Sequence, residues 1–126
     1  MVALVLLALV LQEPVGMLGG GPLGQLVPVT RRYPRVPLAA LATTRITHVE
    51  VCGPVVYVRK QRRDGDVHVT ISDGKTKVVA EIIPSIPLPR PVKGQIILVH
   101  GISRYDRFHK WGEVHPVEWW ERVTTC

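Results

Sequence analysis

Five short stretches of β-prone residues, each bounded by Gly, Pro or Asp, fill the chain between Ile46 and Trp120. Stretches of this length at this spacing predict an all-β domain, and five antiparallel strands are enough to close a small barrel. The predicted strands are residues 46–58, 66–72, 77–83, 95–102 and 112–120. We therefore expect a five-stranded Greek-key barrel preceded by an irregular N-terminal segment.

The second stretch shows the alternation most clearly. Val67, Val69 and Ile71 share one face, and the polar residues between Asp66 and Ser72 share the other. Such alternation is typical of a strand with one buried and one wet face. An Asp-Gly pair precedes the stretch and another follows it, and both are tight-turn signals. Residues 66–72 and 77–83 are therefore expected to form a hairpin.

Gly53-Pro54 interrupts the first stretch and marks a bulge or a sharp bend in a long strand. Beyond this break we expect Val56 and Val58 to point inward and Tyr57 and Arg59 to point outward, because neighbouring strand residues face opposite ways.

Proline shapes the later part of the domain. The segment between the third and fourth strands carries Pro87, Pro89 and Pro91, which exclude a helix and predict an extended connection. The fourth strand is almost entirely apolar and is expected to be buried on both faces or covered by the N-terminal segment. Pro116 lacks an amide donor, so the fifth strand should be an edge strand or be bulged there.

The first 44 residues differ from the rest. Met1–Leu11 is continuously apolar, too short to span a bilayer, and lacks the basic residues that precede the apolar part of a signal peptide. An export signal and an apolar arm that packs on this or another subunit both remain open, so the localisation is exported or cell-surface in one case and cytoplasmic in the other. We divide the chain into residues 1–44, a barrel at 45–122 and a tail at 123–126.

Charge points to a polyanionic partner. The net charge is +6 with a pI of about 9.8, and from Arg45 onward 13 Lys or Arg oppose nine Asp or Glu. A basic surface favours nucleic acid or an acidic membrane, although a basic protein without such a partner is equally consistent. Cys52 and Cys126 form either a disulfide or two free thiols.

Three segments resemble the OB-fold nucleic-acid-binding modules: Val49–Val56 with its central glycine, Val67–Gly74, and Pro91–Gly101. The resemblance implies a binding face on the second and third strands, flanked by the loops after the first and fourth strands. Both of those loops are basic in this chain.

A single-strand reader combines cations that follow the phosphates with aromatic platforms for the bases. The expected function is therefore binding of single-stranded nucleic acid, DNA or RNA, with low sequence specificity. The candidate nucleic-acid-binding residues are Tyr57, Arg59, Lys60, Arg62, Arg63, His68, Lys75, Lys77, Arg104, Tyr105, Arg107, Phe108, Lys110 and Trp111. The competing interpretation is that these are solvated turns and that Phe108 or Trp111 closes the end of the barrel.

Two other functions stay open. One is an exported structural or protein-interaction subunit that forms homo-oligomers through the N-terminal arm and the pair Trp119-Trp120, although we expect one of these indoles in the core and favour packing for the other. The second is an oligosaccharide binder, which would use the aromatic residues without the cations.

Enzyme chemistry is not expected. Asp64-Gly65-Asp66 resembles the Asp-Gly-Asp of the thermonuclease family, but the Arg which that family requires further on is missing around Val79-Ala80-Glu81. The histidines, His48, His68, His100, His109 and His115, are dispersed without a metal-binding spacing. We therefore predict no catalytic residue, no metal site and no cofactor.

Overall fold

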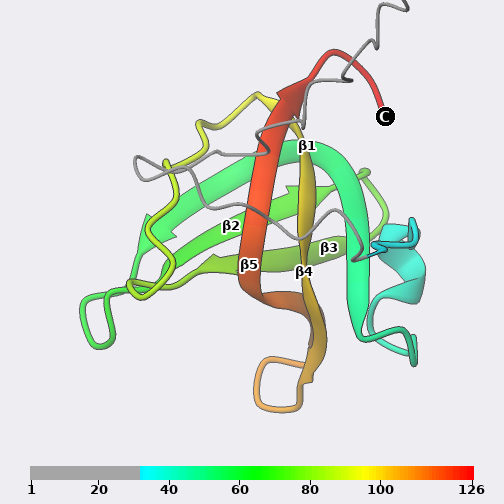
Figure 1. The fold of residues 1–126 in the computed structure, drawn as a ribbon, viewed down its shortest axis with the longest axis horizontal. Coiled ribbons are helices and arrows are strands. Elements are labelled where there is room, and N and C mark those ends of the chain that lie inside the picture. Colours follow the sequence, from blue (N-terminus) through cyan, green and yellow to red (C-terminus); the bar gives the residue numbers. More distant parts are fainter. Residues whose placement is uncertain (1–31) are drawn as a thin grey trace, which may run out of the picture.

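The computed structural model describes residues 32–126, which form a closed five-stranded barrel (Figure 1). A short 3₁₀ helix, η1 (Leu38–Ala40), precedes the strands. The strands are β1 (His48–Lys60), β2 (Val67–Ser72), β3 (Lys77–Ile82), β4 (Ile96–Asp106) and β5 (Trp111–Val123). Their order around the barrel is β1-β2-β3-β5-β4, and only the β3–β5 pairing is parallel. The prediction of an all-β, five-stranded barrel is confirmed.

Met1–Leu11 and the linker up to Arg31 lie outside the described residues, so the export signal and the apolar arm both stay predictions. Within residues 32–126, no helix has the length and apolar character needed to cross a membrane.

The barrel interior is filled by aliphatic side chains at alternate strand positions. Val49 and Val51 of β1, Val69 and Ile71 of β2, and Val99 of β4 are all at most 1% exposed. This is the period-2 pattern that the sequence shows in residues 66–72, and β2 and β3 form the predicted hairpin. The interior-facing positions therefore hold the barrel together through apolar burial, while the outward positions are left to carry function.

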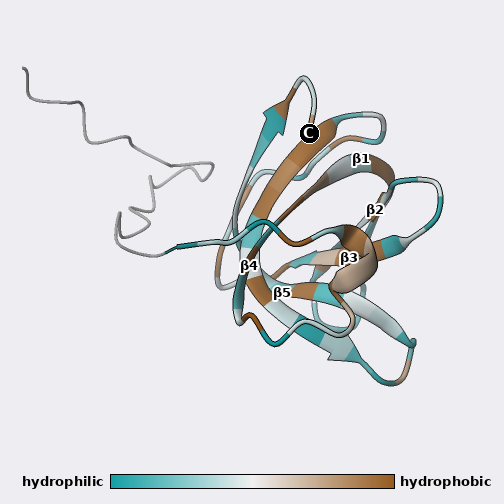
Figure 2. Cartoon of the chain, turned by 90° about the vertical axis from the view of Figure 1, so that its right-hand side faces the viewer, coloured by the Kyte–Doolittle hydropathy of each residue, from teal (hydrophilic) through white to brown (hydrophobic). Residues whose placement is uncertain are grey.

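The segment ahead of β1 closes one end of the barrel. Leu38 and Leu41 are buried in the same core as the strands, and η1 presents a mainly hydrophobic surface in Figure 2. Gly112 permits this contact, because a Cβ there would lie 2.7 Å from the backbone nitrogen of Ala42. The packed unit therefore includes residues 38–41, whereas the sequence led us to expect that the barrel starts at residue 45.

A bulge in β1 changes which residues reach the outer face. The register against β2 shifts between Val55 and Tyr57, two residues after the break that Gly53-Pro54 predicts. Val55 is therefore the core residue, and Val56 lies outside the core beside Tyr57. The expectation that Val56 points inward is wrong because the bulge inserts one residue, whereas Val58 does pack against the core.

Pro116 also lies at an irregularity. The β4–β5 register shifts on both sides of Gly101, opposite this part of β5, and a Cβ on Gly101 would overlap the Pro116 carbonyl oxygen. β5 pairs with β3 as well as β4, so it is bulged rather than an edge strand. The connection from Ile83 to Gln95 contains no helix, as its prolines predict.

The two adjacent tryptophans are both covered. Trp119 is 6% exposed and packs against His100, whose other neighbour is the stacked ring of Tyr33. Trp120 lies against the core, and its Nε1 donates to the Pro89 carbonyl at 2.7 Å. The expectation that the second indole is packed agrees with this arrangement, but its partners among residues 32–126 are the core and Pro89 and not the N-terminal segment.

A disulfide joins β1 to the C-terminus. Cys52 and Cys126 are bonded across a sequence separation of 74 residues. Arg35 Nη1 additionally donates to the carbonyl of Cys126 at 3.5 Å. The alternative of two free thiols does not describe this structure.

Candidate nucleic-acid interface

A groove runs over the outer face of β1, β2 and β3. It consists of two adjoining hollows of about 570 and 380 Å³, which share Tyr57, Thr70, Val79 and Trp111. The first hollow extends to Ser72 and Lys77 at one end of the β2–β3 hairpin. The second extends to Arg59, Gln61, His68 and His109 at the other end. The groove therefore follows β2, a strand of six residues and roughly 20 Å.

Aromatic rings line this groove. Tyr57 is 54% exposed, and Trp111 stacks on His109 with ring centroids 4.4 Å apart and planes 7° apart. Phe108, which lines neither hollow, meets His109 edge to face and is 88% exposed. These rings provide flat surfaces on which bases could stack.

Asp106 holds the histidine of this stack in place. Its Oδ2 lies 2.6 Å from Nδ1 of His109, and its Oδ1 accepts the backbone N–H groups of Phe108 and His109. The hydrogen bond with the His109 side chain and those from the backbone hold the pKa of Asp106 below its usual value. The turn from Asp106 to Lys110 is thereby ordered, which positions His109 over Trp111.

The predicted cations differ in how they relate to the groove. Arg59 and Lys77 line it. Lys60 instead lines a separate hollow near Pro84 and Leu88. Exposed cations in the connecting turns are Arg62 and Arg63 after β1, Lys75 after β2, and Arg107 and Lys110 after β4.

Two further predicted site residues, Arg104 and Tyr105, do not line the groove. Arg104 forms an ion pair with the buried carboxylate of Glu113, with Nε 3.3 Å from Oε1. Tyr105 is 45% exposed but lines neither hollow of the groove.

The two basic connections flank the same end of the groove. Gln61, from the β1–β2 connection, and His109, from the β4–β5 connection, both line the second hollow. In Figure 1 these connections are the green loop at the lower left and the orange loop at the bottom.

An acidic cluster lies on the outer face of the barrel beside this groove. His68, which lines the groove, is 3.1 Å from Glu81 across the β2–β3 pairing. Glu81 in turn lies 3.0 Å from His115, and Trp111 Nε1 donates to Glu113 at 3.4 Å. The cluster thus adjoins the groove through His68 and Trp111.

Burial governs protonation in this cluster. Burial, and then the neighbouring carboxylate of Glu113, raise the pKa of Glu81 to about 8. Burial and the nearby Asp64 likewise raise the pKa of Asp66. Burial lowers the pKa of His68, despite several carboxylates around it. Glu81, Glu113 and His115 were not predicted as a group from the sequence, although strict alternation along the third strand does put Glu81 on the face of Val79.

Comparison with known proteins yields a likeness of fold. No family model and no curated protein sequence matches the chain. Among the solved structures that match is one described as an aspartyl-tRNA synthetase from Leishmania major Friedlin, with 17% identity and a TM-score of 0.59. The match covers 79% of this chain but 23% of that one, so this chain corresponds to less than a quarter of it. This likeness and the closed five-stranded barrel fit an OB-like fold.

Proposed function

We propose that the protein is a non-catalytic module that binds single-stranded nucleic acid along the groove over β1, β2 and β3, with low sequence specificity. The observation that carries this proposal is the combination in one groove of aromatic rings, Tyr57 and Trp111, with the cations Arg59 and Lys77. Rings of this kind bind any base through its flat face, and the cations neutralise phosphates.

The shape of the groove favours a flexible single strand over a duplex. Its hollows are small, and their rings can reach a base only when that base is unpaired and turned outward. The similar solved structure is, by its name, a protein that acts on tRNA, which makes RNA one of the ligands to test.

The test measures binding of fluorescent oligo(dT), oligo(rU) and a DNA duplex to the full chain by anisotropy. Single strands should bind more tightly than the duplex. Tyr57→Ala should weaken binding about 5- to 150-fold, since one base stack contributes about 1–3 kcal/mol. Tyr105→Ala is the matched control, because Tyr105 has similar exposure but lies outside the groove, and it should change little.

Salt dependence tests the electrostatic part. With two phosphates neutralised by Arg59 and Lys77, the logarithm of the binding constant should fall with slope about −1.4 or steeper, or about sevenfold between 50 and 200 mM salt. Lys77→Gln should make the slope shallower, and Lys93→Gln, an exposed cation outside the groove, should leave it unchanged. Salt-insensitive binding, or no binding of any single strand, would overturn the proposal.

A further inference from the structure

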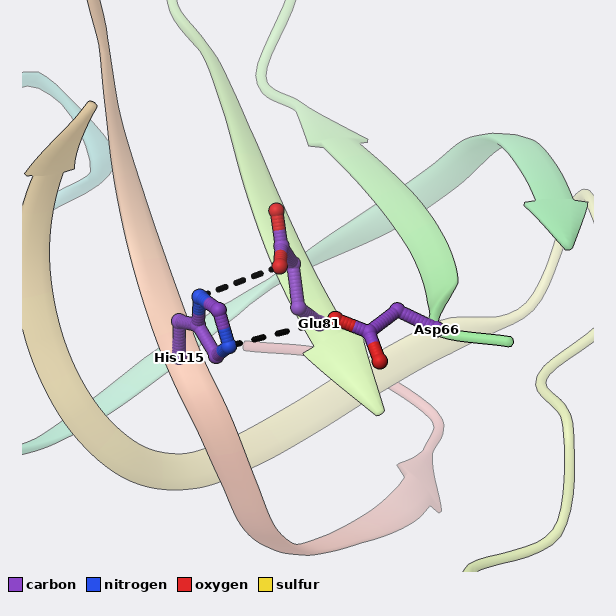
Figure 3. A group of neighbouring side chains, drawn as sticks. All are labelled: Asp66, Glu81 and His115. Atoms are coloured by element: carbon purple, nitrogen blue, oxygen red, sulfur yellow. Dashed lines mark ion pairs between the residues drawn. The ribbon is translucent and has the colours of Figure 1, made fainter. Parts of the chain in front are cut away.

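Three potential metal ligands converge from separate elements of the barrel. Asp66 lies just before β2, Glu81 is in β3 and His115 is in β5 (Figure 3). One ligand atom from each can be chosen so that all lie within 4.8 Å of one another. Because the parallel β3–β5 pairing is what places His115 beside Glu81, the group exists only in the folded barrel.

The imidazole of His115 lies between the two carboxylates. His115 Nδ1 is 3.0 Å from Glu81 Oε2, and His115 Nε2 is 3.9 Å from Asp66 Oδ2. Ligands placed at about 2.0–2.2 Å from a common ion are roughly 3.0 Å apart at a right angle and 4.4 Å apart on opposite sides. The contact between His115 Nδ1 and Glu81 falls in this range. An imidazole turns one nitrogen toward an ion, so one carboxylate side chain has to rotate before both can meet the ion at the same nitrogen of His115.

Asp66 supplies an independent reason to expect a ligand. The residue is only 8% exposed overall and its side chain 12%, and its ion-pair partner in the described part of the chain, His115, is as far as 3.9 Å away. A buried carboxylate is ordinarily hydrogen-bonded or paired at closer range. Figure 3 shows the Asp66 side chain directed toward Glu81 and His115.

Charge balance favours a cation as well. Asp66, Glu81 and Glu113 bring three buried carboxylates together, whereas Arg104 is the one permanently charged side chain paired with them in the described part of the chain. A divalent ion would allow all three carboxyl groups to be ionised together in this buried position.

From this arrangement we propose that Asp66, Glu81 and His115 bind a divalent transition-metal ion such as Zn²⁺ or Mn²⁺. One imidazole with two carboxylates is a mixed nitrogen and oxygen donor set, which suits such ions better than Mg²⁺. His68, 3.1 Å from Glu81, would orient that carboxylate from the side away from His115. The proposal stands independently of nucleic-acid binding.

The test titrates Zn²⁺ and Mn²⁺, with Mg²⁺ and Ca²⁺ for comparison, into the chelator-treated full chain by calorimetry without nucleic acid. We expect one ion per chain, at least tenfold tighter for Zn²⁺ or Mn²⁺ than for Mg²⁺. Asp66→Asn and His115→Gln should each weaken binding at least tenfold. His48→Gln is the matched control, since His48 forms a histidine–carboxylate pair with Glu118 outside the cluster, and it should bind like the wild type.

A second measurement needs no variant. In the wild-type protein, Mn²⁺ should broaden the amide NMR signals of residues 66, 81 and 115 at lower concentrations than it broadens those of residues 38–41 in and after η1. Absence of one-to-one binding in the micromolar to low millimolar range would overturn the proposal. So would broadening confined to other residues, or equal losses in His48→Gln and His115→Gln.

Discussion

Leu41 offers the sharpest test of how this barrel is closed. It is 2% exposed and belongs to the same core as the strand residues, although it precedes β1 and follows the short helix η1. If residues 38–41 seal the barrel, Leu41→Ala must lower the free energy of unfolding as much as a core substitution within a strand. If these residues only rest on the surface, the loss of stability must be small.

The expected magnitude follows from burial. The substitution removes three aliphatic carbons, which corresponds to about 2.4 kcal/mol at about 0.8 kcal/mol each. The cavity left behind adds to this, and buried Leu→Ala changes span roughly 2.7–5.0 kcal/mol. We expect the free energy of unfolding to fall by about 3 kcal/mol, a large share of the roughly 5–15 kcal/mol typical of a domain.

The assay is urea unfolding of the full chain at pH 7, followed by tryptophan fluorescence, with the slope m compared between variants. Val92→Ala is the control, because Val92 is an aliphatic residue that is 61% exposed, and it should change stability by no more than about 0.5 kcal/mol. A loss below about 1 kcal/mol for Leu41→Ala, with m unchanged, would refute the idea that residues 38–41 seal the barrel.

Two further predictions concern contacts made by the first half of β1, at Cys52 and Glu50. Cys126→Ser should lower the free energy of unfolding by up to about 4.5 kcal/mol, the chain-entropy value for a closed loop of 74 residues. Thr125→Ser is the control and should leave the free energy of unfolding unchanged. If dithiothreitol did not change the urea midpoint of the wild-type protein, this prediction would be contradicted. Partial burial raises the pKa of Glu50, but hydrogen bonds from His100 and Arg35 outweigh it and hold that pKa below 4.5. The ionised Glu50 therefore stabilises the fold above about pH 4.5, and this stabilisation is lost as the pH falls through the lowered pKa. Glu50→Gln should be less stable than wild type at pH 7, and the difference should shrink steadily as the pH is lowered below 4.5; a difference that does not shrink would argue against the assignment.

Much of the strand framework could be predicted from local sequence. Asp-Gly turns and strict alternation fix the β2–β3 hairpin within one residue at each end, because turn chemistry and side-chain period are properties of neighbouring residues. The placement of Tyr57 on the outer face followed from the same period. The placement of Val56 did not, because the bulge between Val55 and Tyr57 depends on how β1 pairs with β2.

The residues of the candidate sites also differ in whether local sequence could predict their place. Arg59, Lys77 and Trp111 could be proposed for a groove because they belong to strands or turns whose place in an OB-like barrel is known in advance. Nothing local in the sequence indicates that Arg104 would turn to Glu113 rather than to a ligand, since that contact joins residues on paired strands.

By itself, the sequence determined an all-β chain with a basic surface, its turns, and the alternating residues that fill the barrel. These properties depend on residues a few positions apart. Only the tertiary structure decided that Leu41 enters the core, that Cys52 bonds to Cys126, and that Asp66, Glu81 and His115 meet. Each of these contacts joins distant segments, and their proximity arises from closing the sheet through the β1–β4 and β3–β5 pairings.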